Sequence, residues 1–408
     1  MAAPLKGNIA VGQSGGPTAV INSSLAGVIE EARKHSDITG VYGMWHGIEG
    51  FLREELIDLY AQPTEILEGL KRTPSAALGS CRYKLKEPDY ERILDLFRKY
   101  NIRYFHYIGG NDSQDTSNRI SKMAQEQGYE LRVIGVPKTI DNDLSATDHC
   151  PGYGSVARYI AVTTQEMGMD TEAIGSVDHV KILEAMGRNA GWIAAAAMLG
   201  KKDEEDPPHL IYVPERPITW AGFLSDVQRV YDRLGYCVAV VCEGLTDADT
   251  GAPITASASS VDVDAFGHKQ MGGVADTLCK EISAQLKIKA RYDKPGTIQR
   301  MSMALSSQVD LQESYMVGAQ AVREALSGKT GSMVTLVRES NHPYRCGTGL
   351  VPLADAALAE KKLPADYFNQ AGNFPTEGFA KYARPLIGGP LPEYVRFRKI
   401  WVSLSGKG

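Results

Sequence analysis

The sequence predicts an α/β protein with two domains, each built on a mostly parallel sheet with helices on both faces. Two observations lead to this prediction. Short apolar runs alternate with longer segments of helical periodicity along most of the chain, and polar or glycine-rich turns follow the apolar runs. The chain of 408 residues is also too long to fold around one small core, so two or three domains are expected.

The first half of the chain alternates strands and helices. Its apolar runs predict strands at 8–12, 38–44, 103–108 and 131–136, and its periodic segments predict helices at 18–34, 88–100 and 114–127. We assign no element between 45 and 83. Because the chain repeats strand, turn and helix, the strands should form a parallel sheet, and ligands of such sheets bind beyond the carboxyl ends of the strands.

The second half repeats this style. Strands are expected at 180–185, 209–213, 236–242 and 332–337, and helices at 152–167, 190–199, 218–234, 271–286 and 309–326. Residues 293–299 suggest a turn with a short extended piece. Small and polar residues predict a mobile excursion over 247–263, and the proline-rich stretch 343–408 is left unassigned.

Composition excludes several classes of protein. A net charge of −5 argues against a nucleic-acid binder. The six cysteines form no Cys-x-x-Cys pair, which favours a reduced, cytoplasmic protein. The N-terminus has no apolar signal core, and no run approaches the length that spans a bilayer, so we expect no membrane partner.

Chemistry-bearing residues gather in the run 137–143, which follows a predicted buried strand. Asp141 and Asp143 lie two positions apart, so in an extended loop they point the same way and repulsion raises the pKa of one of them. Such an acid is a candidate general base. The alternative is a turn whose Asp and Asn side chains cap their own backbone.

Two glycine loops also follow predicted strands. Ser14-Gly15-Gly16 precedes a helix, so its backbone N–H groups can approach an anion, or it can be a tight turn without a ligand. Gly109-Gly110-Asn111-Asp112-Ser113 adds an amide and a carboxylate that can hold Mg²⁺. Helix capping by Asp112 or Ser113 is the other interpretation of that loop.

Further polar residues follow the strands of the second half. Arg188 in Met186-Gly187-Arg188 can bind a phosphate, and Glu243 can accept from a sugar hydroxyl. Arg291, Lys294 and Arg300 suggest a basic neighbourhood around a turn. Each of these has a plain surface role as its alternative. Taken together, the loops indicate phosphoryl transfer to a hydroxyl, with a base that accepts the hydroxyl proton.

These motifs, in this order, resemble the 6-phosphofructokinase family, and within it the pyrophosphate-dependent branch. The resemblance runs from Gly12 to about Gly318. The matching motifs are Ser14-Gly15-Gly16, Leu78-Gly79-Ser80-x-Arg82, the 109–113 loop, the 137–143 run, Met186-Gly187-Arg188, Cys242-Glu243-Gly244 and Ile298-Gln299-Arg300.

The resemblance implies a fold of two Rossmann-like three-layer α/β domains. The first comprises 1–150 plus about 299–355 and holds the phosphoryl-donor site. The second comprises 151–298 plus the C-terminal segment and holds the sugar-phosphate site. The implied reaction transfers a phosphoryl group reversibly from pyrophosphate to the C1 hydroxyl of fructose 6-phosphate with Mg²⁺, in glycolysis or gluconeogenesis, in a homodimer.

The resemblance also implies residue roles. Asp141 would accept the proton, and Gly15 and Arg82 would face the donor. The positions that match the sugar-phosphate site are Thr139, Ile140, Asp141, Met186, Gly187, Arg188, Glu243, Thr297 and Arg300. Asn111 and Asp143 would lie at the metal, although the family usually has an aspartate where this chain has Asn111. Thr297 replaces a histidine that ATP-using relatives have near the sugar 6-phosphate.

Donor choice depends on Asp112 and Lys138. ATP-using relatives resemble this chain but carry glycine at both positions. A carboxylate at Asp112 would repel the α-phosphate of ATP, and Lys138 can neutralise a pyrophosphate leaving group. The alternatives are an ATP-dependent 6-phosphofructokinase, a non-catalytic sugar-phosphate-binding relative, and a dehydrogenase, which lacks its glycine fingerprint here. Sedoheptulose 7-phosphate is a further possible substrate.

Overall fold

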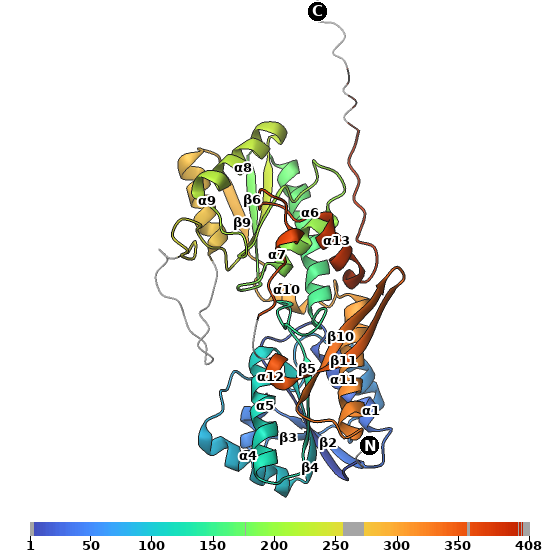
Figure 1. Ribbon diagram of the computed structural model, residues 1–408. Coiled ribbons are helices and arrows are strands. Elements are labelled where there is room, and N and C mark those ends of the chain that lie inside the picture. Colours follow the sequence, from blue (N-terminus) through green and yellow to red (C-terminus); the bar gives the residue numbers. More distant parts are fainter. Residues whose placement is uncertain are drawn as a thin grey trace, which may run out of the picture.

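Two lobes stacked end to end make up the protein, in a computed structural model that describes residues 4–175, 177–255, 273–356, 360–398, 400 and 402 (Figure 1). The lower lobe is built on a seven-stranded sheet of order β11-β10-β5-β4-β1-β2-β3. Its strands are β1 (Gly7–Gln13), β2 (Ile38–Met44), β3 (Leu56–Asp58), β4 (Ile102–Gly109), β5 (Arg132–Pro137), β10 (Ser332–Asn341) and β11 (Tyr344–Pro352). The five inner strands are parallel, and β3 and β11 are antiparallel edges.

Alternation along β1 explains why this sheet has a core on each face. Ile9 and Val11 belong to one buried cluster, which includes side chains of α1 (Ile21–Ala32) and α11 (Gln308–Leu326). Ala10, between them, belongs to the cluster that packs on α4 (Glu87–Lys99) and α5 (Asn111–Glu126). The remaining helices of this lobe are α2 (Gly47–Leu52), α3 (Thr64–Leu70) and α12 (Leu353–Ala356).

Helices α1 and α11 touch backbone to backbone. A Cβ on Gly27 would lie 2.2 Å from the carbonyl oxygen of Tyr315, and a Cβ on Gly318 would lie 2.0 Å from that of Ser24. Glycine is therefore required at both positions by the close approach of the two helices.

The upper lobe holds a fully parallel four-stranded sheet of order β7-β8-β6-β9. Its strands are β6 (Val180–Ala185), β7 (Leu210–Tyr212), β8 (Cys237–Cys242) and β9 (Ala290–Asp293). Val238 and Val240 face the cluster of α6 (Tyr153–Ala173) and α7 (Trp192–Ala196), and Val241 faces that of α8 (Trp220–Leu234) and α9 (Val274–Gln285). The short elements of this lobe are η1 (Ala197–Gly200), η2 (Ala365–Tyr367), α13 (Glu377–Ala383) and η3 (Arg384–Ile387), and α10 (Ile298–Met301) lies between the two lobes (Figure 1).

The predicted α/β class with two mostly parallel sheets is confirmed. Several bounds differ from the predictions. The helix expected at 152–167 continues to Ala173, and the strand expected at 332–337 continues to Asn341 and returns as β11. A turn and a short extended piece were expected at 293–299. The structure instead has an edge strand of the second sheet, β9, that ends at Asp293, and α10 begins at Ile298. The unassigned stretch 45–83 contains α2, β3 and α3.

The excursion expected at 247–263 lies partly outside the described residues, as does the start of the helix expected at 271–286. Within the described part, Asp247 closes a turn by accepting hydrogen bonds from the N–H groups of Asp249 (2.8 Å) and Thr250 (3.0 Å). In the described part of the chain, no helix combines the length and the apolar character that crossing a membrane requires.

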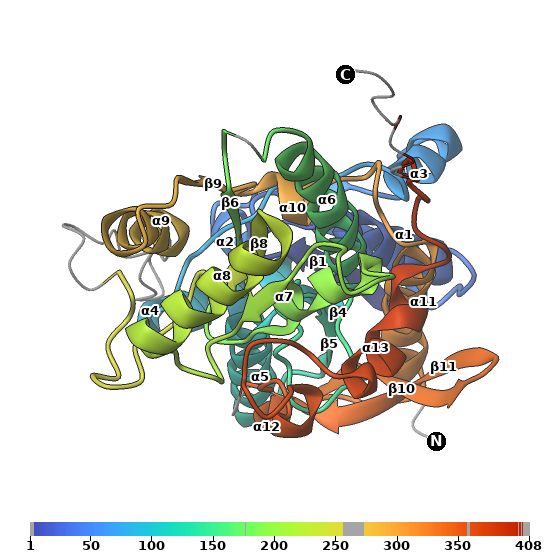
Figure 2. The same cartoon turned by 90° about the horizontal axis from the view of Figure 1, so that it is seen from above.

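The lobes are joined by several chain crossings and by the β10–β11 hairpin, which lies beside α13 in both views (Figures 1 and 2). Arg338 of β10 donates a hydrogen bond to the carbonyl of Tyr382 in α13 at 2.9 Å. The first sheet draws its strands from 7–137 and 332–352, and the second from 180–293. We propose on this basis that the domains divide as the sequence predicted, with the site between them.

Candidate active site

Three loops of the lower lobe meet at Lys138. They follow β1, β4 and β5, which are adjacent parallel strands, so their carboxyl ends share one edge of the sheet. Lys138 donates from Nζ to the carbonyl of Gly16 at 2.7 Å. A Cβ on Gly15 would lie 3.4 Å from the same Nζ, and one on Gly110 would lie 3.6 Å from the Lys138 carbonyl oxygen. The glycines therefore allow the lysine to lie against both loops.

Lys138 is almost fully buried, with 4% of its surface exposed. Burial lowers the pKa of its ammonium group to about 8, against the opposing effect of Asp141, while the nearby Arg300 lowers it further. A buried cation beside a glycine loop is suited to attract and neutralise a phosphate. Lys138 thus interacts with both the Asp141 carboxylate and the Arg300 guanidinium.

Asp141 lies in a turn that Thr139 and Asn142 build. Its N–H donates to the hydroxyl of Thr139 at 3.1 Å, and Asn142 adopts a left-handed conformation with φ of 56°. The Asn142 side chain accepts from the N–H of Cys150 at 3.0 Å. The structure thus shows the turn that was the alternative interpretation of this run, built by the side chains of Thr139 and Asn142.

Burial raises the pKa of Asp141 to about 7, and the negative charge of Asp143 adds to the rise. The positive charges of Arg188 and Lys138 act in the opposite direction. A carboxyl group with its pKa close to neutrality is matched to the task of a general base. This agrees with the role that the sequence predicted for Asp141, which stays a prediction.

Asn111 and Asp143 lie next to each other. The Asn111 amide donates from Nδ2 to Asp143 at 3.2 Å, and its Oδ1 is buried without a hydrogen-bond partner among the described residues. Burial also raises the pKa of Asp143. An unpaired buried oxygen beside a carboxylate is a donor set of the kind that Mg²⁺ prefers, so these two residues fit a magnesium ion.

Asp112 and Arg82 are exposed, in contrast to Lys138. Asp112 lies in the first turn of α5, whose N-cap is Gly110 with no side-chain cap. The capping role that we considered for Asp112 or Ser113 is therefore not seen at this helix end.

The sugar side of the site is formed after β6 and β8. Gly187 and Arg188 both have positive φ, 136° and 51°, so the chain turns sharply there. Glu243 fixes this turn by accepting from the N–H of Arg188 at 3.2 Å, and Gln299 accepts from the N–H of Met186 at 3.0 Å. Burial raises the pKa of Glu243.

Arg300 lies in α10, between the two lobes, and comes against the donor loops (Figure 1). A Cβ on Gly16 would lie 2.8 Å from Nη1 of Arg300, and the N–H of Ala19 donates to the Arg300 carbonyl at 2.8 Å. Its Nε is buried without a partner among the described residues. Burial and then the charge of Arg82 lower the pKa of Arg300, so the two guanidinium groups are close enough to repel each other. An anion placed there would relieve this repulsion.

The predicted basic neighbourhood of Arg291, Lys294 and Arg300 is not one cluster. Arg291 pairs with Asp178 at 2.8 Å, and Lys294 pairs with Glu184 at 2.9 Å. Opposite charges thus neutralise both, and Arg300 alone of the three lies against the glycine loop. Thr297 is exposed at the start of α10.

Sequence reasoning missed the residues that the C-terminal segment brings to the site. Lys361 donates its backbone N–H to the carbonyl of Asp143 at 2.7 Å, and Glu360 lies close enough to raise the pKa of Asp143. No sequence signal could have placed them, because the segment shows no periodicity and lies more than 200 residues away along the chain.

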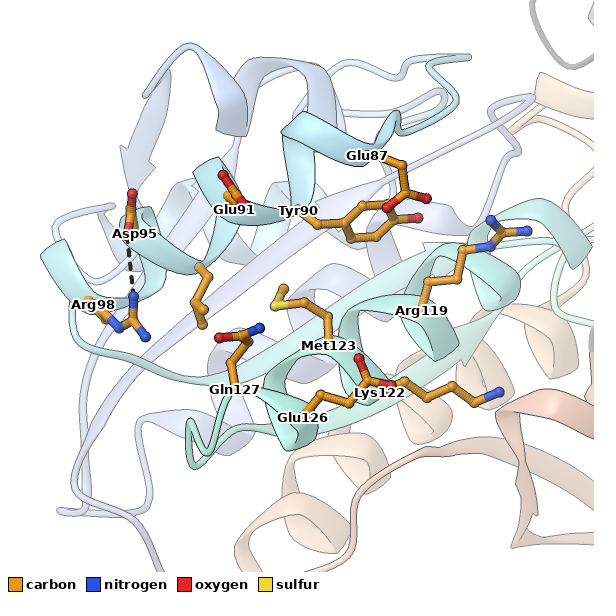
Figure 3. Close-up of a pocket in the computed structure, with 11 residues that line it drawn as sticks. Glu87, Tyr90, Glu91, Asp95, Arg98, Arg119, Lys122, Met123, Glu126 and Gln127 are labelled. Carbon is orange, nitrogen blue, oxygen red and sulfur yellow. Dashed lines mark hydrogen bonds and ion pairs between the residues drawn. The ribbon is translucent and has the colours of Figure 1, made fainter.

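A groove between α4 and α5 is separate from this site (Figure 3). Its floor includes Leu94 and Met123, and charged side chains, such as Arg98 bonded to Asp95 at 3.3 Å, form its rim. None of its lining residues belongs to the loops described above.

Comparison with known proteins agrees with this geometry. The phosphofructokinase family model matches residues 8–325. The chain is 44% identical over 384 residues to the pyrophosphate–fructose 6-phosphate 1-phosphotransferase of Halomonas elongata, covering 92% of this chain and 91% of that protein. It is 42% identical over 412 residues to the protein of that name from Xanthomonas campestris pv. campestris, covering 97% of each.

The crystal structure of the pyrophosphate-dependent phosphofructokinase from Marinobacter aquaeolei superimposes with a TM-score of 0.85 at 41% identity, covering 95% of this chain and 94% of that one. The family model covers more than half of the chain, and these relatives match it over nearly their whole length. The resemblance found in the sequence is thereby confirmed, and this chain belongs to the phosphofructokinase family.

Proposed function

We propose that this protein transfers a phosphoryl group from pyrophosphate to the C1 hydroxyl of fructose 6-phosphate. The observation that carries the proposal is the pair of the buried Lys138 and the half-buried Asp141, one at the glycine loops and the other near the positive charge of Arg188 on the sugar side. The relatives named above carry out this reaction according to their names.

In the forward reaction the C1 oxygen of the sugar attacks the nearer phosphorus of pyrophosphate. The proton of the hydroxyl passes to the Asp141 carboxylate, and inorganic phosphate leaves with the bridging oxygen. The pKa of about 7 suits Asp141 to accept this proton and to return it in the reverse direction. Thr139 holds the turn that presents the carboxylate.

The sugar phosphate is assigned to the loops of the second lobe. Arg188 and Arg300 would bind its phosphate or the donor phosphates, and Glu243 keeps the Met186-Gly187-Arg188 turn in place. We also assign Thr297, which is exposed at the start of α10, to the sugar phosphate, as the family resemblance implies.

Pyrophosphate is assigned to the space between the glycine loops, Arg82 and Lys138. Because Gly15 has no Cβ, no side chain at that position covers the Lys138 ammonium, which lies 3.4 Å from where such a Cβ would be. Asp112, exposed in the first turn of α5, would repel a third phosphate, which supports pyrophosphate over ATP. Asn111 and Asp143 would hold Mg²⁺, which supplies charge neutralisation to the donor phosphates when bound.

An assay with each donor tests the proposal. Purified protein is given pyrophosphate or ATP with fructose 6-phosphate, and in parallel with sedoheptulose 7-phosphate, in the presence of Mg²⁺. We expect turnover with pyrophosphate and fructose 6-phosphate. Brisk turnover with ATP and none with pyrophosphate would overturn the donor assignment.

A double variant tests the reason for that assignment. Asp112→Gly combined with Lys138→Gly should lose pyrophosphate activity, because it removes both residues on which donor choice depends. Unchanged pyrophosphate kinetics would remove them from the donor site. The homodimer and the cytoplasmic location stay predictions, and light scattering on the purified protein tests the first.

A further inference from the structure

A short C-terminal segment, residues 360–363, crosses the active site between the two lobes. In Figure 1, α12 lies beside the lower lobe and α13 on the upper lobe, and this segment lies between them in the chain. It lies beyond residue 325, where the match to the family model ends. Its contacts join the loop that carries Asp141 to the loop that carries Arg188.

The contacts to the loop that carries Asp141 come from Glu360 and Lys361. The backbone N–H of Lys361 donates to the carbonyl of Asp143 at 2.7 Å, and Glu360 forms an antiparallel bridge with Leu144. The ammonium group of Lys361 donates to the carbonyls of Thr147 (3.1 Å) and Asp148 (2.7 Å). The main chain and side chain of one residue thus hold both ends of the stretch 143–148.

The contacts to the sugar side come from the same segment. Lys362 donates from Nζ to the carbonyl of Asn189 at 2.7 Å, directly after Arg188. The Lys361 carbonyl accepts from the indole N–H of Trp192 at 3.0 Å. Leu363 donates its N–H to Glu215 at 2.9 Å, and Glu215 also accepts from the N–H of Gly191 at 3.0 Å.

The segment 360–363 is held in place by burial and by aromatic contacts. Leu363 is 4% exposed and belongs to the large core cluster of the upper lobe. The Lys361 ammonium lies 5.2 Å from the centre of the Trp192 ring, which suits a cation–π contact. The catalytic loop has a second tie to the C-terminal part of the chain, because Asn142 donates to the hydroxyl of Tyr382 at 2.9 Å.

We propose, building on the proposed function, that Lys361 is a positioning residue that fixes Asp141 and Asp143 relative to the Arg188 turn. A base that moves by about 1 Å can lose about 100-fold in rate, so a residue that sets this distance affects kcat without touching the substrate. Lys361 is well placed for this because its one side chain binds two loop carbonyls while its backbone binds a third.

The first test is kinetic. Lys361→Met keeps most of the side-chain volume and removes the ammonium group. We expect kcat with pyrophosphate to fall about 10- to 100-fold. KM for fructose 6-phosphate should stay within about twofold, because the sugar-binding groups remain. Lys361→Arg keeps a cation with N–H donors and should recover most of the loss. Lys381→Met, at an exposed lysine of α13, is the matched control and should behave as the wild type.

The second test does not depend on the reaction. Hydrogen exchange followed by mass spectrometry in the full chain without ligands reports the peptide that covers 139–150. This peptide should exchange faster in Lys361→Met than in the wild type and in Lys381→Met, and Lys361→Arg should restore slow exchange. If the wild type does not use pyrophosphate, the proposed function fails while this measurement still decides the role of Lys361.

Two outcomes would overturn the proposal. One is a folded Lys361→Met protein with wild-type kcat and wild-type exchange over 139–150. The other is a loss shared equally by kcat, KM and the exchange of peptides throughout the chain, with no recovery in Lys361→Arg, because that pattern reports general destabilisation.

Discussion

Asp141 and Asp112 lie at the ends of neighbouring parallel strands, and the structure separates them by burial. Asp141 follows β5 and is half-buried in the loop that begins with the buried Lys138, where burial raises its pKa to about 7. Asp112 follows β4 in the first turn of α5 and is exposed. From position in the sequence alone, both acids are equally placed at the end of a strand, where ligands bind. Under the proposed function, this difference favours Asp141 for proton transfer and leaves Asp112 to act on the donor through its charge.

The largest effect should come from Asp141→Asn. The amide keeps the shape of the side chain but cannot accept the proton, so we expect kcat to fall by about 10²- to 10⁴-fold. Steady-state assays with pyrophosphate and fructose 6-phosphate measure it. Asp112→Asn is the matched control, and equal losses in the two variants would break the comparison.

Removal of the buried cation should have the next largest effect. Lys138→Met leaves the site without the charge that faces the donor, so we expect kcat/KM for pyrophosphate to fall by about 100-fold. Isothermal titration calorimetry with fructose 6-phosphate alone serves as the control, because sugar binding should persist. A variant with intact pyrophosphate kinetics would contradict the role that we give to Lys138.

The pH dependence should reflect the shifted pKa values of Asp141 and Lys138. Asp141 must be ionised to accept a proton, so kcat/KM in the forward direction should fall tenfold per pH unit below about 7. Lys138 must keep its proton, so the rate should also fall above about 8. Rates measured from pH 5 to 10 test both limbs. Two variants separate enzyme ionisation from substrate ionisation. Asp112→Asn should keep both limbs of the pH profile, and the residual activity of Asp141→Asn should lack the acid limb.

The smallest effect should come from Asp112→Asn itself. Loss of an exposed charge changes an interaction by about 1 kcal/mol, so we expect kcat/KM for pyrophosphate to change by no more than about fivefold. Turnover with ATP, measured in the same preparation, should rise as the repulsion of a third phosphate is removed. A fall as large as that of Asp141→Asn would show that exposure does not separate the two acids.

Patterns in the sequence were enough to predict the class of fold and the strand-end loops. Apolar runs bounded by turns identify strands because a strand covered on both faces must be apolar throughout, as in Cys237–Cys242. The same local logic identified the glycine loops, because Gly15 and Gly187 need positive φ. Ordered motifs then identified the family, and the comparisons confirmed it.

Tertiary structure alone decided which charges are buried together and which segment holds the site. The pKa of Lys138 or Asp141 depends on neighbours from other loops, including Arg300 and Arg188, whose distances no local pattern encodes. The contact between Lys361 and the loop 143–148 spans more than 200 residues of chain. It makes no periodic signal, because hydrogen bonds to backbone carbonyls require a position in space and no particular sequence.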